Sequence, residues 1–482
     1  MNVKFTVRVL GFIVIVSTGV MILPLLVALN EGTPDRVSFM LSVTAGLICG
    51  ILMLLMTRHC DMNAGGIREG ICITVFSWVI VSTLGALPYS LCCEVAYVDA
   101  FFEAMSGFTT TGATIFTDIE ALPDGILLWR SLTHLMGGMG IIVLSLAVLP
   151  FLGVSGMEMY KAEVPGVTAG KVTPRLHQTA LRLWMIYIML ALVETVLLMM
   201  GGMTLFDAFC HSCSTLATGG FSTKNNSIAY YHSAYIQWVI IVFMFLSGIN
   251  FSLYFLIPKK KLREIFSDDE LRGYIRVITF SVIGIMTSLY VTGHLEGIEY
   301  ILRHSCFTVV SVITTTGFVT EDFDKWPQFA RVIIILLMFS GACGGSTGGG
   351  CKVSRFQIMY REFKSEAMRL LHPRAVITPS MNGQPLTQDT INSSTAFFAL
   401  YMIMLCVGTL IMSSFGIEVL TSFTGVLTCL SNVGPGLDYL GAQENFAWLP
   451  NALKWLLSFL MLAGRLELFA VILLLMPSTY KR

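Results

Sequence analysis

The stretch "DAFFEAMSGFTTTGA", residues 99–113, has three counterparts in the same chain, and these four segments decide the fold. The counterparts are "DAFCHSCSTLATGGF" from Asp207, "HSCFTVVSVITTTGF" from His304 and "TSFTGVLTCLSNVGP" from Thr421. They align without a gap, and each has a glycine 13 positions after its first residue and a hydroxyl-bearing residue six positions before that glycine. The glycines are Gly112, Gly220, Gly317 and Gly434, and the hydroxyl residues are Ser106, Ser214, Ser311 and Thr428. Four copies in one register predict an internal repeat.

Each segment is too short to cross a membrane. Its apolar part makes about 15–18 Å of helix, whereas the hydrocarbon core is about 30 Å thick. We therefore expect a half-helix that enters the membrane, turns at the glycine and returns. Longer apolar spans precede the segments, near residues 70–92, 183–203, 274–293 and 395–415. Others follow them, near residues 126–152, 234–257, 328–350 and 452–476. Two further spans, near 5–29 and 37–57, come first.

The composition agrees with a membrane protein. The chain has 482 residues, of which 55% are hydrophobic and 12% charged, about half the roughly 25% charged share of soluble domains. We predict an all-α polytopic fold with four tandem repeats of span, half-helix, turn and span around a central pore, plus two N-terminal transmembrane helices. The expected boundaries are 1–60 for the N-terminal pair and 61–182, 183–270, 271–375 and 376–482 for the repeats.

The charges predict the orientation. The net charge is zero, so no bulk attraction to nucleic acid is expected. Basic residues gather around Lys4, at 58–68, 161–182, 259–263 and 352–374, and at Lys481 and Arg482. The positive-inside rule places these islands and both termini in the cytoplasm. The loops between them carry acidic residues and would form the outer face. Segment 259–272 is either a docking surface for a cytoplasmic partner or a topology anchor.

The turns indicate the chemistry. Backbone that leaves a helix at membrane depth is tolerated where it is buried in protein or lines a water-filled cavity. Four turns around one axis could direct carbonyl oxygens at a dehydrated ion, as potassium filters do. The half-helices would present their C-terminal dipole ends, which favour a cation. The alternative is that the turns are ordinary surface loops between helices.

On these residues the chain resembles the Trk/Ktr/HKT superfamily of potassium transporters, and within it the TrkH-like membrane subunits of bacterial Trk systems. The resemblance covers about residues 1–476. It implies that the filter carbonyls come from Thr110, Thr111 and Gly112; Thr218, Gly219 and Gly220; Thr315, Thr316 and Gly317; and Asn432, Val433 and Gly434. The fourth set departs from the Thr-rich pattern, so its contributions are less defined. In plant relatives a serine at the first filter glycine accompanies sodium permeation, so four glycines imply potassium preference.

The resemblance also implies the setting. It suggests a homodimer in a bacterial inner (plasma) membrane, in contact with lipid, that binds a cytoplasmic ring of TrkA-like nucleotide-binding regulatory subunits. Potassium would be the transported ion, and we expect no cofactor and no catalytic residue. The twelve cysteines lie mostly in apolar runs, where cysteine behaves as a small hydrophobe. "CHSC" at 210–213 has no second ligand pair, so we expect packing there and no transition metal.

The stretch "SGACGGSTGGGCKVSR", residues 340–355, should dissolve the last span of repeat three. Each glycine costs a helix about 0.8–1 kcal/mol relative to alanine. We interpret it as a loop across the pathway under the filter, and the resemblance implies an intramembrane gating loop here. The candidate gating residues are Gly341, Gly344, Gly345, Ser346, Thr347, Gly348, Gly349, Gly350 and Lys352. Close packing of small residues between helices is the alternative. A phosphate-binding loop requires a different order around the lysine and a preceding strand.

Arg465, in "LMLAGRLELF", is an ionisable residue inside the last span and therefore a functional candidate. Below the filter it would repel cations and could hold the glycine loop through its carbonyls. The resemblance also implies an arginine here. The alternative is a structural ion pair with a carboxylate on another helix; Glu467, two residues on, points to a different helix face.

Two further expectations concern the half-helices and the end of the second span of repeat one. Asp99 and Asp207 should cap their half-helices, and residues 134–140 should form a tight helix contact or line the pore. An ion-coupled secondary transporter of a small solute is the competing function. A membrane redox enzyme would need paired histidines across spans, and the histidines are scattered.

Overall fold

The computed structural model describes residues 2–59, 66–140, 176–258, 260–294 and 297–476. The expected span residues 141–152, the basic residues 161–175, Lys259 and the C-terminal Lys481 and Arg482 therefore lie outside the described part. Within it, six helical segments are long and apolar enough to cross a membrane: Val3–Glu31, Asp35–Met56, Arg68–Cys92, Ala180–Met200, Asp269–Thr292 and Gln388–Ser414. The predicted all-α polytopic fold class is confirmed.

The N-terminal unit and the spans before each half-helix follow in chain order. The unit comprises α1 (Val3–Val20), α2 (Ile22–Glu31) and α3 (Asp35–Met56). The later spans are α4 (Ile67–Gly85) with α5 (Leu87–Cys92), then α10 (Leu176–Met200), α14 (Asp269–Thr292) and α18 (Gln388–Ser414). A short helix, α13 (Leu262–Ser267), precedes α14.

The half-helices are short. They are α6 (Tyr97–Phe108), α11 (Leu205–Ala217), α15 (Ile298–Ile313) and α19 (Val419–Ser431). A second helix follows each of them: α7 (Asp124–Gly138), α12 (Ala234–Ser247), α16 (Gln328–Ser340) and α20 (Asn451–Arg465). Between α6 or its counterparts and these second helices the chain runs through irregular loops with the 3₁₀ turns η2 (Ser227–Tyr230), η4 (Phe323–Lys325) and η5 (Asp438–Leu440).

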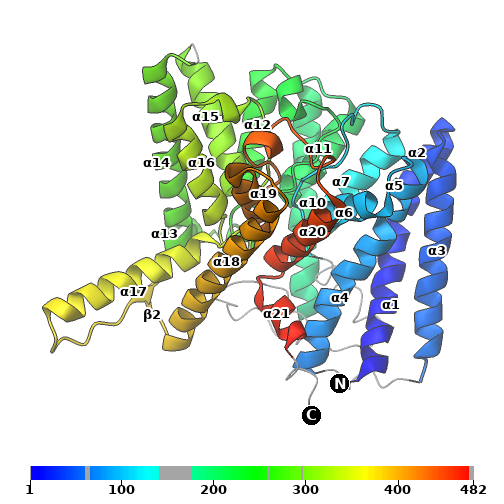
Figure 1. Cartoon of the computed structure of the whole chain (residues 1–482). Coiled ribbons are helices and arrows are strands. Elements are labelled where there is room, and N and C mark those ends of the chain that lie inside the picture. The colour runs from blue at the N-terminus through cyan, green and yellow to red at the C-terminus, as the bar shows by residue number, and fades with distance from the viewer. Residues whose placement is uncertain (1, 60–65, 141–175, 259, 295–296, 477–482) are drawn as a thin grey trace.

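The remaining elements are η3 (Phe251–Leu256), α17 (Val353–Leu371), the two-stranded hairpin β1 (Ser380–Met381) and β2 (Gln384–Pro385), and α21 (Phe469–Leu475). Figure 1 shows α17, the hairpin and α21 in the half of the molecule in which α1 starts. In Figure 1, α17 projects sideways from the helix bundle.

All four second helices end before the predicted limit of their span, at Gly138, Ser247, Ser340 and Arg465, which the sequence analysis expected for repeat three alone. The apolar spans expected near 234–257 and 452–476 each consist of two helical pieces: α12 is followed by η3, and α20 by α21. The helices end where their backbone meets the preceding half-helices: a Cβ on Gly137 would lie 1.9 Å from the Phe108 carbonyl oxygen, and one on Gly464 2.0 Å from that of Leu430. Glycine permits this approach and also weakens the helix.

The expected caps are also wrong. Ala96 and Thr204 occupy the N-cap positions of α6 and α11, and the Thr204 side chain accepts from the Asp207 amide. Asp99 instead pairs with Lys454 (2.5 Å), and Asp207 accepts from the Thr223 hydroxyl (2.6 Å). Both carboxylates still lie in the first turn, where the helix dipole favours negative charge.

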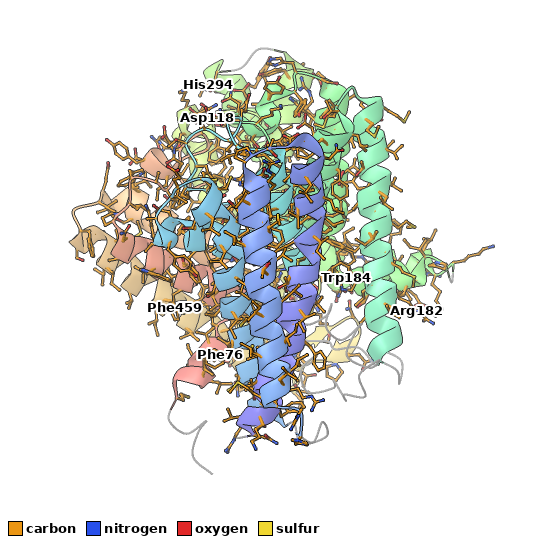
Figure 2. All side chains as sticks on the ribbon, turned by 90° about the vertical axis from the view of Figure 1, so that its right-hand side faces the viewer. Phe76, Asp118, Arg182, Trp184, His294 and Phe459 are labelled. Carbon is orange, nitrogen blue, oxygen red and sulfur yellow. The ribbon has the colours of Figure 1, made fainter. Side chains whose placement is uncertain are left out.

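The N-terminal unit packs through small residues. Ser38, Ser42, Gly46 and Gly50 recur every fourth position of α3 and are buried. A Cβ on Gly50 would lie 2.6 Å from Cγ1 of Ile15, and one on Gly46 2.3 Å from Oγ1 of Thr18. Such stripes let membrane helices approach closely. Figure 2, viewed from this side, shows α1 and α3 in front of the rest of the bundle.

We predict that Gly50→Leu lowers the stability of the protein by about 1–3 kcal/mol, because its side chain must displace α1. Thermal unfolding of the detergent-purified protein measures the change. Ile51→Leu, at a position 48% exposed, is the matched control. Equal unfolding temperatures for Gly50→Leu and the wild type would contradict the packing described here.

Candidate ion pathway

The four glycine turns share one backbone conformation. The residue two before each glycine has a left-handed φ: Thr110 54°, Thr218 56°, Thr315 60° and Asn432 57°. The glycines do too: Gly112 83°, Gly220 84°, Gly317 76° and Gly434 100°. Between them, the amide of the middle residue donates to the carbonyl of the repeated hydroxyl residue, as from Thr111 to Ser106 and from Thr316 to Ser311 (both 2.8 Å). The equivalent bonds join Gly219 to Ser214 (2.8 Å) and Val433 to Thr428 (2.9 Å).

The turns meet in a closed ring in chain order. A Cβ on Gly112 would lie 2.1 Å from the carbonyl oxygen of Gly219, one on Gly220 2.1 Å from that of Thr316, and one on Gly317 2.1 Å from that of Val433. A Cβ on Gly434 would lie 2.6 Å from the Thr111 oxygen, which closes the circle. Each of these positions therefore requires glycine for two reasons: its φ is positive, and a side chain would collide with the neighbouring turn's carbonyl. Separate surface turns do not fit this geometry.

Side-chain hydrogen bonds brace single turns and, in one case, join two of them. Thr109 and Thr111 share a hydroxyl hydrogen bond (2.8 Å), as do Thr314 and Thr316 (2.8 Å). In the fourth turn, the Asn432 amide donates to Thr111 Oγ1 (3.0 Å) and to the Met461 carbonyl (2.9 Å). The departure of this turn from the Thr-rich pattern thus gives a clasp between the fourth turn, the first turn and α20.

Two cavities adjoin the ring. One, of about 160 Å³, is lined by the four turn glycines and by the loops that follow them. The other, of about 110 Å³, is lined by Trp78, Gly138–Gly140, Gly345–Gly350, Lys352 and Arg465. The C-terminal part of segment 134–140 and the second half of the glycine-rich stretch therefore line the same chamber. Residues 341–350 are named the glycine loop below.

The glycine loop lies against the third turn and the break after α12. The Gly349 amide donates to Thr315 Oγ1 (2.7 Å), and the Cys343 amide donates to the Gly248 carbonyl (3.1 Å). Lys352 is buried and donates to the Gly348 carbonyl. Gly341, Gly345 and Gly350 have φ of 66°, 73° and 72°. The chain therefore passes beneath the ring as irregular backbone whose groups have protein partners.

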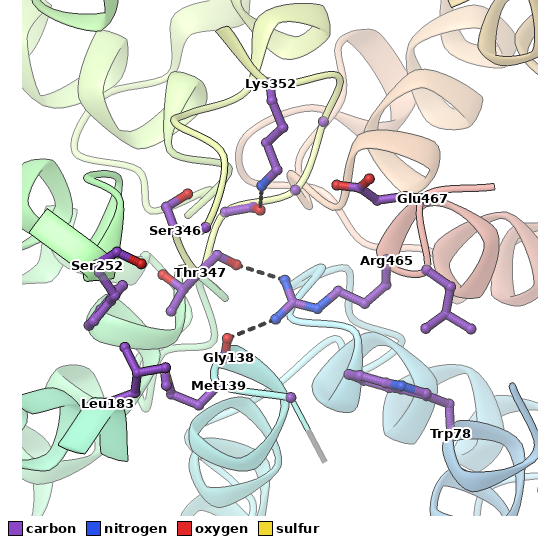
Figure 3. A pocket seen from close by; sticks show the side chains of 18 residues that line it. Trp78, Gly138, Met139, Leu183, Ser252, Ser346, Thr347, Lys352, Arg465 and Glu467 are labelled. Atoms are coloured by element: carbon purple, nitrogen blue, oxygen red, sulfur yellow. Dashed lines mark hydrogen bonds between the residues drawn. The ribbon is translucent and has the colours of Figure 1, made fainter. Parts of the chain in front are cut away.

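Arg465 spans the chamber (Figure 3). Its guanidinium donates to the carbonyls of Thr347 (2.7 Å), Gly137 (2.5 Å) and Gly138 (2.9 Å). It thereby joins the glycine loop to the end of α7. Glu467 pairs instead with Arg355 of α17. Arg465 and Lys352 place two basic side chains in the same cavity lining.

A buried ion pair behind the first two turns was missed by the sequence analysis. Arg130 Nε lies 2.8 Å from Glu103 Oε1, and the side chains are 1% and 0% exposed. Glu103 accepts from the Ile115 amide (2.9 Å), and Arg130 donates to the Ser222 carbonyl (3.1 Å). The pair therefore joins the chain after the first turn to the chain after the second. The sequence does carry a signal for this pair: Glu103 and Arg130 are charges of opposite sign, each within an apolar run of repeat one.

The "CHSC" motif lies within α11. Cys210 and Cys213 are buried, and His211 hydrogen bonds through Nε2 to Ser222 Oγ (2.9 Å) and through Nδ1 to the Asp207 carbonyl (2.7 Å). The histidine therefore fixes the segment after the second turn against the start of its half-helix.

Comparison with known proteins gives a consistent result. Residues 38–480 match the TrkH family model, described as a cation transport protein. The chain is 36% identical to the Trk system potassium uptake protein TrkH of Salmonella typhimurium over 485 residues, which covers all of both chains. It is 35% identical to the TrkG protein of Escherichia coli, with 98% of each chain covered. The crystal structure of the potassium transporter TrkH from Vibrio parahaemolyticus superposes with a TM-score of 0.89 and 34% identity over all of both chains.

We predict that Glu103→Gln destabilises the protein by about 3–5 kcal/mol, because it leaves the buried Arg130 charge without its counter-ion. The unfolding temperature in detergent should fall. Glu444→Gln, at an exposed position on the loop after the fourth turn, serves as the matched control. A fall no larger than the control's would show that the pair does not hold the two turns together.

Proposed function

The chain belongs to the TrkH family of cation transport proteins, and we propose that it takes up potassium ions through the ring of four turns. The observation that carries the proposal is the closed ring itself, in which each turn's glycine lies against a carbonyl of the next turn. Carbonyl rings of this kind replace the hydration shell of potassium. The relatives are named as potassium uptake proteins, which supports the same ion for this chain.

The filter residues are proposed from this geometry. The carbonyls of residues 110–112, 218–220, 315–317 and 432–434 would form successive layers around the ion. The half-helices α6, α11, α15 and α19 end at these turns, so their negative dipole ends would favour a cation there. Oxygen dipoles hold an ion without the tight binding of a carboxylate, so the ion can also leave.

An acidic residue, Asp118, lies on the loop after the first turn. The Asn225 amide donates to Asp118 (3.0 Å), and this hydrogen bond lowers the pKa of the Asp118 carboxyl below its ordinary value. The carboxyl is therefore ionised at neutral pH. Acidic groups near a pore mouth raise the local cation concentration.

The gate is proposed in the inner chamber. The glycine loop occupies the lining under the third turn, and Arg465 holds it through Thr347. A cation leaving the ring would meet the guanidinium of Arg465 and the Lys352 ammonium. Repulsion in this poorly solvated space would close the pathway, and displacement of the loop would open it.

The setting is proposed from the family. The chain would lie in a bacterial inner membrane with both termini in the cytoplasm, in four repeats bounded at 61–182, 183–270, 271–375 and 376–482. The Trk system name of its relatives supports a regulatory partner, proposed as a TrkA-like nucleotide-binding subunit on the cytoplasmic side. A homodimer is supported by apolar side chains on projecting α17, where Tyr360 and Phe363 are 67% and 72% exposed.

We expect the purified protein in liposomes to take up potassium and rubidium much faster than sodium. The measurement is flux of each ion down equal gradients. Gly112→Ser should reduce the preference, because its Cβ would collide with the Gly219 carbonyl and displace the ring. Gly19→Ser, near the end of α1 with nothing within 4 Å of an added Cβ, is the control. Comparable sodium and potassium rates in the wild type would reject the proposed filter.

We also expect Arg465→Ala to raise potassium flux several-fold without a change of selectivity, since it removes the positive charge and the bond to the glycine loop. The flux of Arg465→Lys should lie between those of the wild type and Arg465→Ala. A lysine keeps the positive charge but lacks the planar guanidinium that donates to three carbonyls at once. Arg276→Ala, on the exposed face of α14, is the control. Flux equal to that of the wild type would refute a barrier at Arg465.

A further inference from the structure

One carboxylate anchors the glycine loop and the helix that follows it. Glu270, the second residue of α14, is 9% exposed. Its Oε1 accepts from the Gly344 amide (2.6 Å) and from the Ser354 amide (3.2 Å). Gly344 lies within the loop, and Ser354 is the second residue of α17. Hydrogen bonds to an ionised acceptor are about twice as strong as neutral ones, so this oxygen fixes the loop relative to α17.

The residue before Glu270 is bonded to the exposed hairpin. The Asn382 amide donates to Asp269 Oδ2 (2.7 Å), and the Asp269 amide donates to Asn382 Oδ1 (2.7 Å). Arg361 of α17 also pairs with Asp269 Oδ2 (2.9 Å). Any force that moves the hairpin or α17 therefore acts on the first turn of α14, one residue from the carboxylate that holds the loop.

The other contacts of the loop lead inward. They join it to the break after α12, to Thr315 of the third turn and to Arg465. Glu270 differs because its own helix begins at the surface that carries α13, the hairpin and α17. It is the point at which that surface meets the loop.

We infer that Glu270 is a positioning residue for the gate: it holds the glycine loop across the pathway through Gly344 and Ser354, and the hairpin at Asn382 controls that hold. The inference rests on the proposed gating role of the loop. When the hairpin shifts α14, the two amides lose their common acceptor and the loop can leave the chamber. Because two loop positions need differ little in free energy, a small displacement suffices.

The test uses the full-length protein in liposomes and two readouts. Glu270→Ala removes both hydrogen bonds, and Glu270→Gln keeps the shape and weakens them. Potassium flux should rise in the order wild type, Glu270→Gln, Glu270→Ala. The flux of Glu270→Ala should be roughly tenfold that of the wild type, because the loss of one hydrogen bond to a charged group changes an equilibrium by about this factor. Selectivity over sodium should not change. Asn382→Ala should raise flux as well, and the double variant with Glu270→Ala should add nothing further.

The second readout does not depend on ion flux. The Cys343 thiol, next to Gly344, is 1% exposed, and its rate of modification by a small methanethiosulfonate reagent can be followed by mass spectrometry of its peptide. Release of the loop should speed this modification. Cys429 of α19, which is 0% exposed, reports general loosening. Glu264→Ala, on α13 and outside these contacts, is the control variant and should change neither thiol nor flux.

The outcomes are distinct. Faster labelling of Cys343 alone, together with higher flux in both Glu270 variants, supports the inference. Faster labelling of Cys343 alone with no ion flux in any variant also supports the hold by Glu270 but overturns the proposed function. Unchanged labelling and flux in Glu270→Gln and Glu270→Ala, or equally faster labelling of Cys429, overturns the inference. So does additivity of Asn382→Ala and Glu270→Ala, because the hairpin would then act elsewhere.

Discussion

A peptide group that leaves a helix inside a membrane must find a partner, because hydrocarbon offers none and each unmet group costs several kcal/mol. The four turns meet this constraint with one hydrogen bond each, from the amide after the left-handed residue to the carbonyl five residues earlier. The bond closes the half-helix and lets a carbonyl of each turn lie against the glycine of its neighbour. The interrupted second helices follow from it, since they must pass beside these closed ends without a side chain in between.

The glycine register predicted the turns to the residue, because a positive φ is a local requirement that the sequence must satisfy locally. Asn432 could not be assigned in this way. Its role depends on Thr111, 321 positions away, and on the Met461 carbonyl. The breaks after α12 and α20 were missed for a related reason: each region has a single glycine, Gly248 or Gly464, and the interruption is imposed by a neighbour. The long run in residues 341–350 was visible because it needs no neighbour to disrupt a helix.

The buried polar residues show the same limit. Glu103 and Arg130 each look costly alone, and only their approach to 2.8 Å explains their presence. Asp99 was expected to cap its own helix but pairs with Lys454 of α20, because the last repeat packs beside the first. Arg465 was recognisable from its place in an apolar span, whereas its three carbonyl partners come from two other repeats. The sequence identifies such residues by their position in apolar segments. Their partners can be named only when the four repeats are arranged in space.

The four quarters of the ring belong to one covalent chain, which separates this design from a pore assembled from identical subunits. In such an assembly every mutation appears four times, so no quarter can specialise. Here a single codon change alters a single quarter, and the asparagine clasp of the fourth turn is a specialisation of that kind. A ring built from one chain therefore allows each quarter to change by itself while the shared backbone pattern preserves the shape of the ring.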